Sequence, residues 1–197
     1  MASPTPEDRG GPPDSWLAEA ERVDLAVYTA IAGTRTPRLD VAMRGLSHAA
    51  DYSRLSIAAS AILAVAGGRR GRRGAAYGLA SVAVTATVVN VVVKPLGHRP
   101  RPDRVAGDVP RARQVRMPAS RSFPSGHTAA AVAFASGAGH VLPLAGAGLH
   151  TLAALVAYSR VHTGVHYPGD VLAGALIGGV IADATVGALD RRSGRSS

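Results

Sequence analysis

The residues from Ser159 to Asp170 read SRVHTGVHYPGD and lie where one long apolar stretch ends and another begins. This segment places an arginine, a histidine and an aspartate at fixed offsets beside that boundary. Two upstream segments occupy the same kind of position, KPLGHRPRP at Lys94–Pro102 and PSGH at Pro124–His127. Together the three segments indicate a binding site for a phosphate group.

The three segments supply the cations that a phosphate monoester requires. Its dianion must be held by several positive charges and hydrogen-bond donors, and its uncatalysed hydrolysis is among the slowest reactions known. Positioning and charge stabilisation provide most of the acceleration in phosphoryl transfer. Lys94, Arg101 and Arg160 offer fixed positive charge, and the planar guanidinium of arginine matches two phosphate oxygens at once.

The same segments supply groups that move protons or attack phosphorus. His127 and His166 can each do either near neutral pH. Asp170 follows His166 at a short spacing, and a carboxylate can hold one imidazole nitrogen protonated so that the other faces the substrate. The spacing permits this pairing.

In their order and spacing the segments resemble the signature of the type 2 phosphatidic acid phosphatase superfamily. These are membrane lipid phosphate phosphatases that share a site with vanadium haloperoxidases. The pattern is a lysine followed after six residues by Arg-Pro, then Pro-Ser-Gly-His, then Ser-Arg, five residues, His, three residues and Asp, and every position is met between Lys94 and Asp170. The resemblance covers about Leu55–Leu189. It implies an all-α integral membrane bundle, usually of six transmembrane helices.

The resemblance also implies a role for each motif residue. His166 attacks phosphorus and forms a phosphohistidine, Asp170 orients it, and His127 protonates the leaving lipid oxygen. The phosphoryl oxygens are bound by cations and donors, namely Lys94, Arg101, Arg160, the Ser125 side chain and the Gly126 backbone N–H. The family needs no metal or other cofactor, in agreement with a sequence that has no cysteine and few carboxylates near the motifs.

Two prolines predict where helices begin beside the motifs. Pro124 and Pro168 each precede an apolar run, and proline is well tolerated at the first helical position. We therefore expect Ser125 and Gly126 in a first turn whose free N–H groups face an anion. Asp170 would lie in the first turn of the next helix, where a negative charge is favourable.

The composition predicts a helical membrane protein of one domain. Hydrophobic residues make up 47% of the 197 residues and aromatic residues only 4%, a mixture suited to closely packed transmembrane helices. We expect five or six spans, at 74–93, 128–139, 142–158 and 171–189, at the shorter run 55–67, and at 16–33 if that segment does not lie in the interface. The predicted domain is 16–189, between a disordered tail at 1–15 and a basic tail at 190–197.

Charge predicts the orientation in the cell membrane. The GGRRGRRG stretch at Gly67–Gly74 reads as a short cytoplasmic loop, and the basic C-terminal tail agrees with it. Alternation of the spans then brings all three motifs to the extracytoplasmic side. The arginine-rich loop Gly97–Arg121 opposes this orientation, because it lies on that outer side. We keep the alternation, because several of these arginines have a ligand role.

Other interpretations remain for the charge and for the histidines outside the motifs. The net charge of +9 permits nucleic-acid binding, but the arginines cluster at membrane borders and few aromatics are available to stack on bases. Attraction to anionic lipids explains them better.

The sequence does not give the oligomeric state. We interpret His98, His140, His150 and His162 as structural, with His162 the first exception to consider.

The sequence also narrows the choice of reaction and substrate. A vanadate-dependent haloperoxidase and a catalytically silent lipid-binding protein are the alternatives from other classes; the apolar runs oppose the first, and the intact His166, His127 and Asp170 oppose the second. The alanine- and arginine-rich composition resembles actinobacterial members of the family, among which are phosphatases acting on decaprenylphosphoryl ribose phosphate in cell-wall synthesis. We therefore favour a prenyl-linked phosphate or diphosphate over phosphatidic acid or phosphatidylglycerol phosphate.

Overall fold

The chain folds entirely into helices and loops over the residues that this computed structural model describes, 16–194. The predicted N-terminal tail at 1–15 and the last residues, 195–197, lie outside that range. The α-helices are α1 (Trp16–Gly33), α2 (Pro37–Ala49), α3 (Arg54–Ala66), α4 (Gly68–Thr87), α5 (Lys94–Leu96), α6 (Gly126–Val141), α7 (Pro143–His162) and α8 (Pro168–Gly194). Short turns of other helix types are η2 (Asp51–Ser53), η3 (Val88–Val93) and η4 (Arg111–Arg113).

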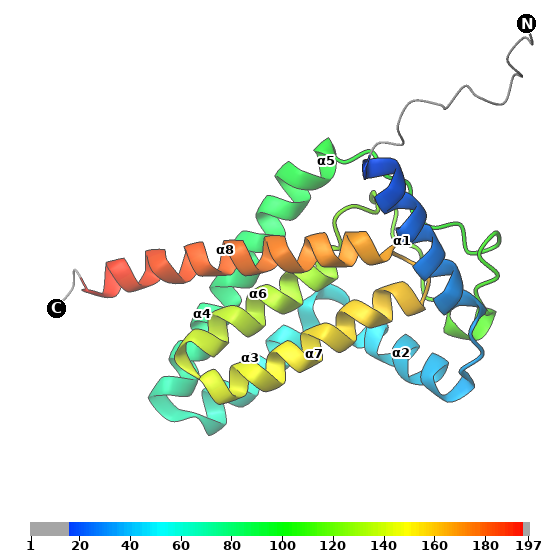
Figure 1. Ribbon diagram of the computed structural model, residues 1–197. Helices are drawn as coiled ribbons and strands as arrows, with labels where there is room; N and C mark the ends of the chain where they lie inside the picture. Colours follow the sequence, from blue (N-terminus) through cyan, green and yellow to red (C-terminus); the bar gives the residue numbers. More distant parts are fainter. Residues whose placement is uncertain (1–15, 195–197) are drawn as a thin grey trace, which may run out of the picture.

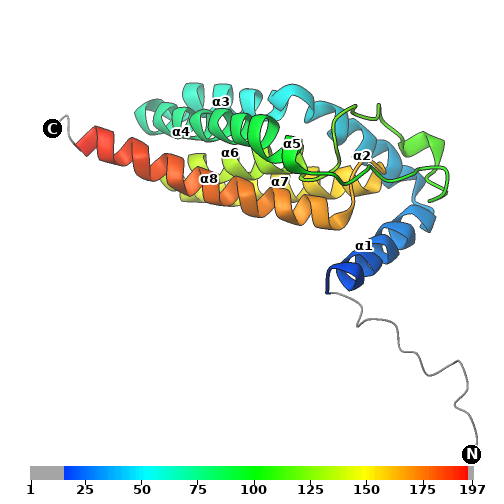
Figure 2. The ribbon, with the colours of Figure 1, turned by 90° about the horizontal axis from the view of Figure 1, so that it is seen from above.

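Helix α6 is the centre of the bundle. It packs against α4, α7 and α8, which surround it in the views from the side and from above (Figures 1 and 2). Small residues allow this close approach: Ala129, Ala133 and Ala138 of α6 have no exposed surface. At Gly178 of α8 an added Cβ would lie 2.3 Å from the Ala129 carbonyl oxygen, so only glycine fits there.

The predicted number of membrane spans is not confirmed. Among the described residues, two helices are long and apolar enough to cross a membrane by themselves, the continuous segment Gly68–Leu96 and Pro168–Gly194. The pair Pro37–Ala49 and Asp51–Ala66 passes the same test together but is bent by 64°. A helix lies at each of the predicted apolar runs, and α8 continues past the predicted boundary at Leu189 to Gly194.

The prediction that Gly67–Gly74 forms a loop is wrong, because α4 already begins at Gly68. The turn between α3 and α4 is confined to Gly67 and Gly68, where Gly68 has a φ of +56° that favours glycine. Helix α4 can approach α3 this closely because Gly71 has no Cβ; one added there would lie 1.9 Å from the Leu63 carbonyl oxygen. The arginines of this stretch are therefore helical.

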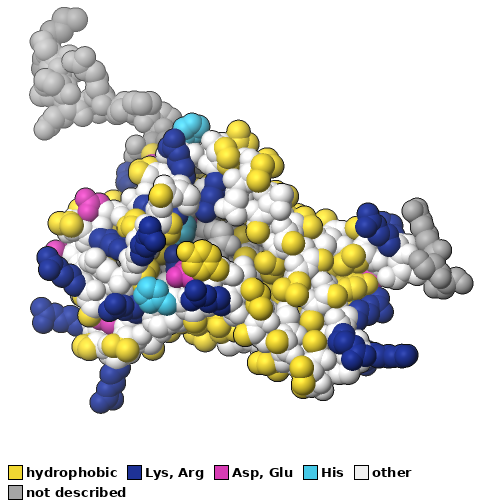
Figure 3. Space-filling model, turned by 180° about the vertical axis from the view of Figure 1, so that it is seen from behind, with side chains coloured by type: hydrophobic (Ala, Val, Ile, Leu, Met, Phe, Trp, Pro, Cys, Tyr) yellow, Lys and Arg dark blue, Asp and Glu magenta, His cyan; other side chains and the backbone are white. Residues whose placement is uncertain are grey.

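The surface has the pattern of a membrane protein. Side chains of Leu172, Leu176 and Val180, spaced four residues apart on α8, are 66 to 71% exposed and form an apolar stripe. Figure 3 shows hydrophobic side chains spread over the bundle, with Lys and Arg gathered at its two ends. The Arg73 guanidinium at the start of α4 pairs with Asp190 near the end of α8 at 3.2 Å, so the basic ends of these helices lie together.

A sharp bend separates α2 from α3. Tyr52 and Ser53 adopt positive φ angles of 56° and 57° within the intervening η2 turn, a region that non-glycine residues seldom occupy. The bend turns Asp51 toward the N-terminus of α6. Such breaks in membrane helices are tolerated where the freed backbone faces a cavity or protein.

The long loop between α5 and α6 is held by its own arginines. Arg113 is fully buried and donates to the carbonyl oxygens of Ile31 and Thr34 at the end of α1, at 3.0 and 2.6 Å. Arg104 donates to the Gly164 carbonyl oxygen at 3.2 Å, in the turn between α7 and α8. These contacts explain part of the arginine content of the loop without a ligand.

Candidate active site

The three motifs meet at one end of the bundle. Lys94 begins α5, PSGH lies at the start of α6, Arg160 lies near the end of α7, and His166 lies in the turn before α8. The sequence placed these residues at boundaries, and the boundaries converge because the helices alternate in direction (Figure 1). Arg160 is within electrostatic range of Lys94, His127 and His166.

His166 is buried and is oriented from both sides. Its Nε2 lies 3.2 Å from Nη1 of Arg101, and its Nδ1 lies 3.4 Å from Oδ2 of Asp170. Because a guanidinium can only donate, Nε2 must accept and the proton of the neutral ring must be on Nδ1, toward Asp170. Burial, followed by the charges of Arg101 and Arg160, lowers the pKa of His166 to about 4. At neutral pH the ring therefore has a free electron pair on Nε2.

Asp170 has no exposed surface and accepts from several donors. Oδ2 accepts from the Ser122 hydroxyl and, at 3.0 Å, from the backbone N–H of Tyr167. Oδ1 accepts from Nη1 of Arg99 at 3.1 Å. The predicted position of Asp170 in the first turn of α8, which begins at Pro168, is confirmed.

The start of α6 differs in one respect from the prediction. Pro124 does not occupy the first helical position: its peptide bond with Phe123 is cis, and the helix begins at Gly126 after Ser125 as N-cap. The Ser125 hydroxyl accepts from the backbone N–H of Thr128 at 3.4 Å. Serine is among the residues preferred at the N-cap, because its side-chain oxygen can accept a hydrogen bond of this kind. Gly126 then presents its N–H in the first turn.

His127 and the phosphate-binding cations have protein partners. Nε2 of His127 lies 3.0 Å from Oδ1 of Asp51. The Lys94 ammonium donates to the Ser120 hydroxyl at 3.2 Å, and Nε of Arg101 donates to the Ser120 carbonyl oxygen at 2.8 Å. The two cations are thus fixed by one residue of the loop.

Arg160 is almost fully buried and retains an unused donor. Its Nη1 bonds to the Ser47 hydroxyl from α2, while its buried Nε has no hydrogen-bond partner among the described residues. An orphaned guanidinium donor is costly in a protein interior. A phosphoryl oxygen is the kind of group that would satisfy it.

Sequence reasoning missed five polar residues around the site: Ser122, Arg99, Asp24, Asp51 and Ser47. All of them except Arg99 lie outside the three motif segments, and their roles arise from the bend at η2, the path of the loop and the docking of α1. Arg99 lies within the first motif segment and could have been noted as a further cation. Of the histidines outside the motifs, His140 pairs with Asp190 at 2.9 Å and His162 with Asp40 at 2.8 Å.

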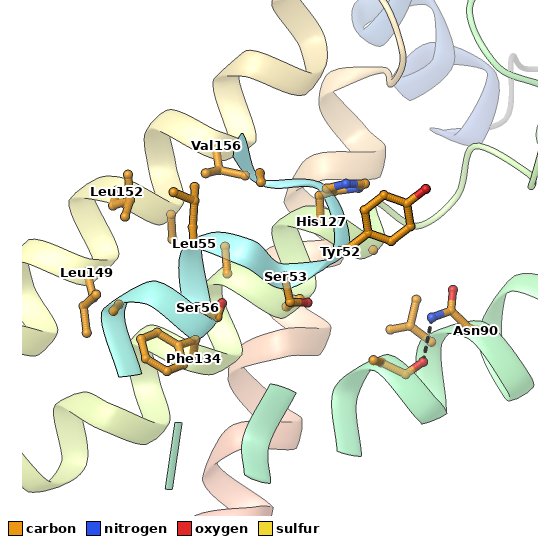
Figure 4. Close-up of a pocket in the computed structure, with 18 of the residues that line it drawn as sticks. Tyr52, Ser53, Leu55, Ser56, Asn90, His127, Phe134, Leu149, Leu152 and Val156 are labelled. Atoms are coloured by element: carbon orange, nitrogen blue, oxygen red, sulfur yellow. Dashed lines mark hydrogen bonds between the residues drawn. The ribbon is translucent and has the colours of Figure 1, made fainter. Parts of the chain in front are cut away.

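An apolar cavity opens beside the motif residues. It has a volume of about 200 Å³, and His127, Lys94 and Gly126 are among the residues that line it. Its walls come from η2, α3, the α4–η3 segment, α6 and α7, and Figure 4 shows Leu55, Phe134, Leu149, Leu152 and Val156 along it. No three His, Asp or Glu side chains within residues 16–194 are placed to bind one metal ion.

Comparison with known proteins identifies the family. A family model described as the PAP2 superfamily matches residues 75–193, which include all three motifs. The chain belongs to the PAP2 superfamily. The resemblance inferred from the motifs is therefore confirmed.

Curated relatives of the PAP2 chain include two mycobacterial enzymes. It is 34% identical over 176 residues to the decaprenylphosphoryl-5-phosphoribose phosphatase of Mycobacterium tuberculosis, covering 86% of this chain and 90% of the relative. It is 35% identical over 158 residues to the enzyme of that name from Mycolicibacterium smegmatis, covering 78% and 80%.

Two solved structures have the same fold. One is the transmembrane PAP2 type phosphatidylglycerolphosphate phosphatase of Bacillus subtilis, with a TM-score of 0.67 and 26% identity, covering 88% of this chain and 87% of that one. The other is LpxE of Aquifex aeolicus, with a TM-score of 0.66 and 26% identity, covering 83% and 94%. The all-helical fold expected from the sequence is thus confirmed.

Proposed function

We propose that this PAP2 phosphatase hydrolyses the phosphate monoester of a prenyl-linked membrane lipid, with His166 as the nucleophile. The observation that carries the proposal is the position of His166, whose unprotonated Nε2 faces the Arg101 guanidinium while Nδ1 faces Asp170. A phosphoryl group bound to Arg101 would stand directly before the attacking nitrogen.

The first half-reaction uses all of the predicted site residues. Lys94, Arg101 and Arg160 bind the phosphoryl oxygens, with the Gly126 N–H and the Ser125 hydroxyl as further donors. Nε2 of His166 attacks phosphorus, the bond from phosphorus to the lipid oxygen breaks, and His127, which takes up a proton when the phosphate dianion binds beside it, gives that proton to the oxygen. Asp170 stabilises the positive charge that develops on the ring by accepting from Nδ1.

The second half-reaction returns the enzyme to its starting state. His127, now neutral, accepts a proton from water, and the water oxygen attacks the phosphohistidine. The bond from phosphorus to Nε2 breaks and inorganic phosphate leaves. Asp51, at 3.0 Å from Nε2 of His127, is placed to hold that ring through both proton transfers. Three fixed cations provide the charge that metal ions supply in other phosphatases.

Two observations support a prenyl-linked substrate. The curated relatives act, by their names, on a decaprenylphosphoryl phosphoribose. The apolar cavity beside His127 and Lys94 has the wall chemistry that an isoprenoid chain needs. A phosphatidylglycerol phosphate is the second candidate, favoured by the Bacillus subtilis structure, which is named for that activity.

The membrane arrangement belongs to the same proposal. We infer five or six spans with α1 at the interface or crossing, and a site on the extracytoplasmic side of the cell membrane. The contact between Arg73 and Asp190 supports this, because it gathers the basic start of α4 and end of α8 at the end of the bundle away from the motifs. Basic ends of this kind favour the cytoplasm.

Phosphate release by the purified protein tests the substrate. A polyprenylphosphoryl phosphoribose, phosphatidic acid and phosphatidylglycerol phosphate would be compared in matched detergent micelles. We expect kcat/KM to be about tenfold or more higher for the prenyl substrate, a difference of about 1.4 kcal/mol in transition-state binding. Equal or better turnover of either glycerolipid would reject the preference. Halide oxidation in the presence of vanadate would favour the haloperoxidase instead.

A further inference from the structure

Arg99 lies between two carboxylates from opposite ends of the chain. Its Nη2 is 2.6 Å from Oδ2 of Asp24 in α1, and its Nη1 is 3.1 Å from Oδ1 of Asp170 in α8. The two carboxylates are 9% and 0% exposed. Because charges this deeply buried are retained only when they are paired, the three residues form one unit, an Asp–Arg–Asp bridge.

Helix α1 is attached to the turn that carries His166 by further contacts. Oδ1 of Asp24 accepts from the backbone N–H of Gly169 at 2.6 Å. The Arg99 guanidinium stacks over the Tyr167 ring at 4.2 Å, and the Tyr28 ring meets Tyr167 edge-on at 5.5 Å. The α1 residue Tyr28 also packs with Val161 and Val171 in one buried cluster. Figure 1 shows α1 crossing the end of the bundle at this point.

The charges of the bridge determine the electrostatic potential that Asp170 exerts on His166. Arg99 alone would neutralise Asp170, leaving a net charge of zero behind the imidazole. With Asp24 included, two carboxylates and one guanidinium leave a net charge of −1. Asp170 therefore keeps the negative potential that stabilises a positively charged ring, while Arg99 holds its second oxygen in place.

We propose that Asp24 and Arg99 are positioning residues of the active site, and that α1 acts through them to orient Asp170 and set its charge toward His166. The proposal rests on the nucleophilic role of His166 described above. Neither residue contacts the reacting atoms. Their influence passes only through Asp170 and the backbone of the turn at Gly169.

The charged groups that face His166 directly are unchanged when Asp24 or Arg99 is replaced. They are Asp170 from α8, Arg101 from the loop, Arg160 from α7 and His127 from α6. A change in the His166 titration on replacing Asp24 or Arg99 is therefore a measure of the bridge itself.

The test measures the His166 titration by NMR of protein labelled with ¹⁵N-histidine in detergent micelles, with the His166→Gln spectrum identifying its signals. Asp24→Asn removes negative charge and should lower the pKa of His166, whereas Arg99→Gln removes positive charge and should raise it, each by roughly one unit. The double variant restores the net charge and should return the pKa toward its original value. Arg99→Lys keeps the charge and should leave it nearly unchanged.

Kinetics provide the second measurement. Asp24→Asn and Arg99→Gln should each lower kcat about tenfold or more, with KM within about threefold of wild type, because the phosphate-binding cations are untouched. Glu21→Gln, an exposed residue on the same helix, and Arg38→Gln, exposed on α2, are matched controls that should change neither quantity. Size-exclusion profiles identify any variant that fails to fold.

The results that overturn the proposal are specific. His166 shifts in the same direction for the two variants, shifts no larger than those of the controls, or a rise in KM at unchanged kcat would each do so. The titration does not depend on turnover. If His166→Ala stayed active, the nucleophilic role would fail, while opposite shifts would still establish the coupling between the bridge and His166.

Discussion

The Nη1 of Arg101 lies 3.2 Å from the Nε2 of His166 and also donates to the Val165 carbonyl oxygen at 2.8 Å. One guanidinium thus fixes the imidazole tautomer and the backbone that carries it. Arg101 is only partly buried, and its other nitrogens donate to Ser120 and to the Arg121 carbonyl oxygen, so a phosphoryl oxygen would bind by replacing one of these partners. Binding of substrate would draw this guanidinium toward phosphate and release the nitrogen that attacks.

The nucleophile is the first residue to test. His166→Ala should lower kcat by several orders of magnitude, because residues that act as a unit in catalysis fail together. Phosphate release under single-turnover conditions measures the loss. His98→Ala is the control, since His98 is exposed in the loop that carries Arg101. Retention of more than about a tenth of wild-type kcat in His166→Ala would reject the phosphohistidine mechanism.

Stability should depend on pH through the same histidine. Since burial lowers the pKa of His166 to about 4 from 6.5, the unfolded chain takes up the proton first as the pH falls. The stabilisation is present above pH 6.5 and is lost progressively down to about pH 4, by up to about 3 kcal/mol.

Thermal unfolding in detergent at several pH values measures this effect. Tm should fall more between pH 6.5 and 4 for wild type than for His166→Gln, which has no titrating ring at this position. His98→Gln should retain the wild-type dependence. Parallel curves for wild type and His166→Gln would show that His166 is not the group responsible.

Metal removal distinguishes fixed cations from a metal site. Because Lys94, Arg101 and Arg160 are placed to carry the charge of the phosphoryl group, activity should survive dialysis against a strong chelator. Vanadate should inhibit competitively by adopting five-coordinate geometry at the same cations. Loss of activity in chelator that a divalent ion restores would mean that a metal carries the charge.

The motif residues could be predicted from the sequence because their spacing encodes both chemistry and position. Lys94, His127, Arg160 and His166 lie at or beside helix ends, and Arg101 lies in the loop that follows α5, so a change from apolar to polar composition is visible at each. The partners that orient them could not be predicted. Asp51 reaches His127 only because of the left-handed turn at Tyr52 and Ser53, and nothing in the local composition requires that turn.

Long-range packing also explains the errors in the predicted elements. The stretch Gly67–Gly74 looked like a loop because glycine and arginine alternate there, yet it is helical because Gly71 allows α4 to pack on the Leu63 carbonyl. The burial of Asp24 could not be predicted either, because Asp24 lies within the expected segment 16–33 and has no partner close by in the sequence. Its burial against Arg99 and Gly169 depends on a loop and a turn more than 70 residues away.

Sidedness can be tested because the chain has no cysteine. Val105→Cys lies in the long loop, where the side chain is 86% exposed, and Arg70→Cys lies at the exposed start of α4. The neighbouring Gly71 is unsuitable for a cysteine, because a side chain added there would meet the Leu63 carbonyl oxygen. An impermeant thiol reagent on intact cells should label Val105→Cys and spare Arg70→Cys until the cells are opened. The reverse pattern would place the site on the cytoplasmic side.

The apolar cavity provides the last prediction, which concerns the lipid chain. Leu152 lines the cavity from α7, between Leu149 and Val156 (Figure 4), and Leu152→Trp should fill much of the space that an isoprenoid chain would occupy. We expect kcat/KM for the polyprenyl substrate to fall about tenfold or more, because the displaced chain loses buried apolar area. A water-soluble short-chain phosphate occupies the phosphate site without extending to Leu152, so its kcat/KM should stay within about threefold of wild type. Leu176→Trp, on the exposed stripe of α8, is the matched control and should affect neither substrate. An equal loss for both substrates would mean that the tryptophan disturbs the phosphate site, and no loss for the polyprenyl substrate would exclude the cavity as its binding place.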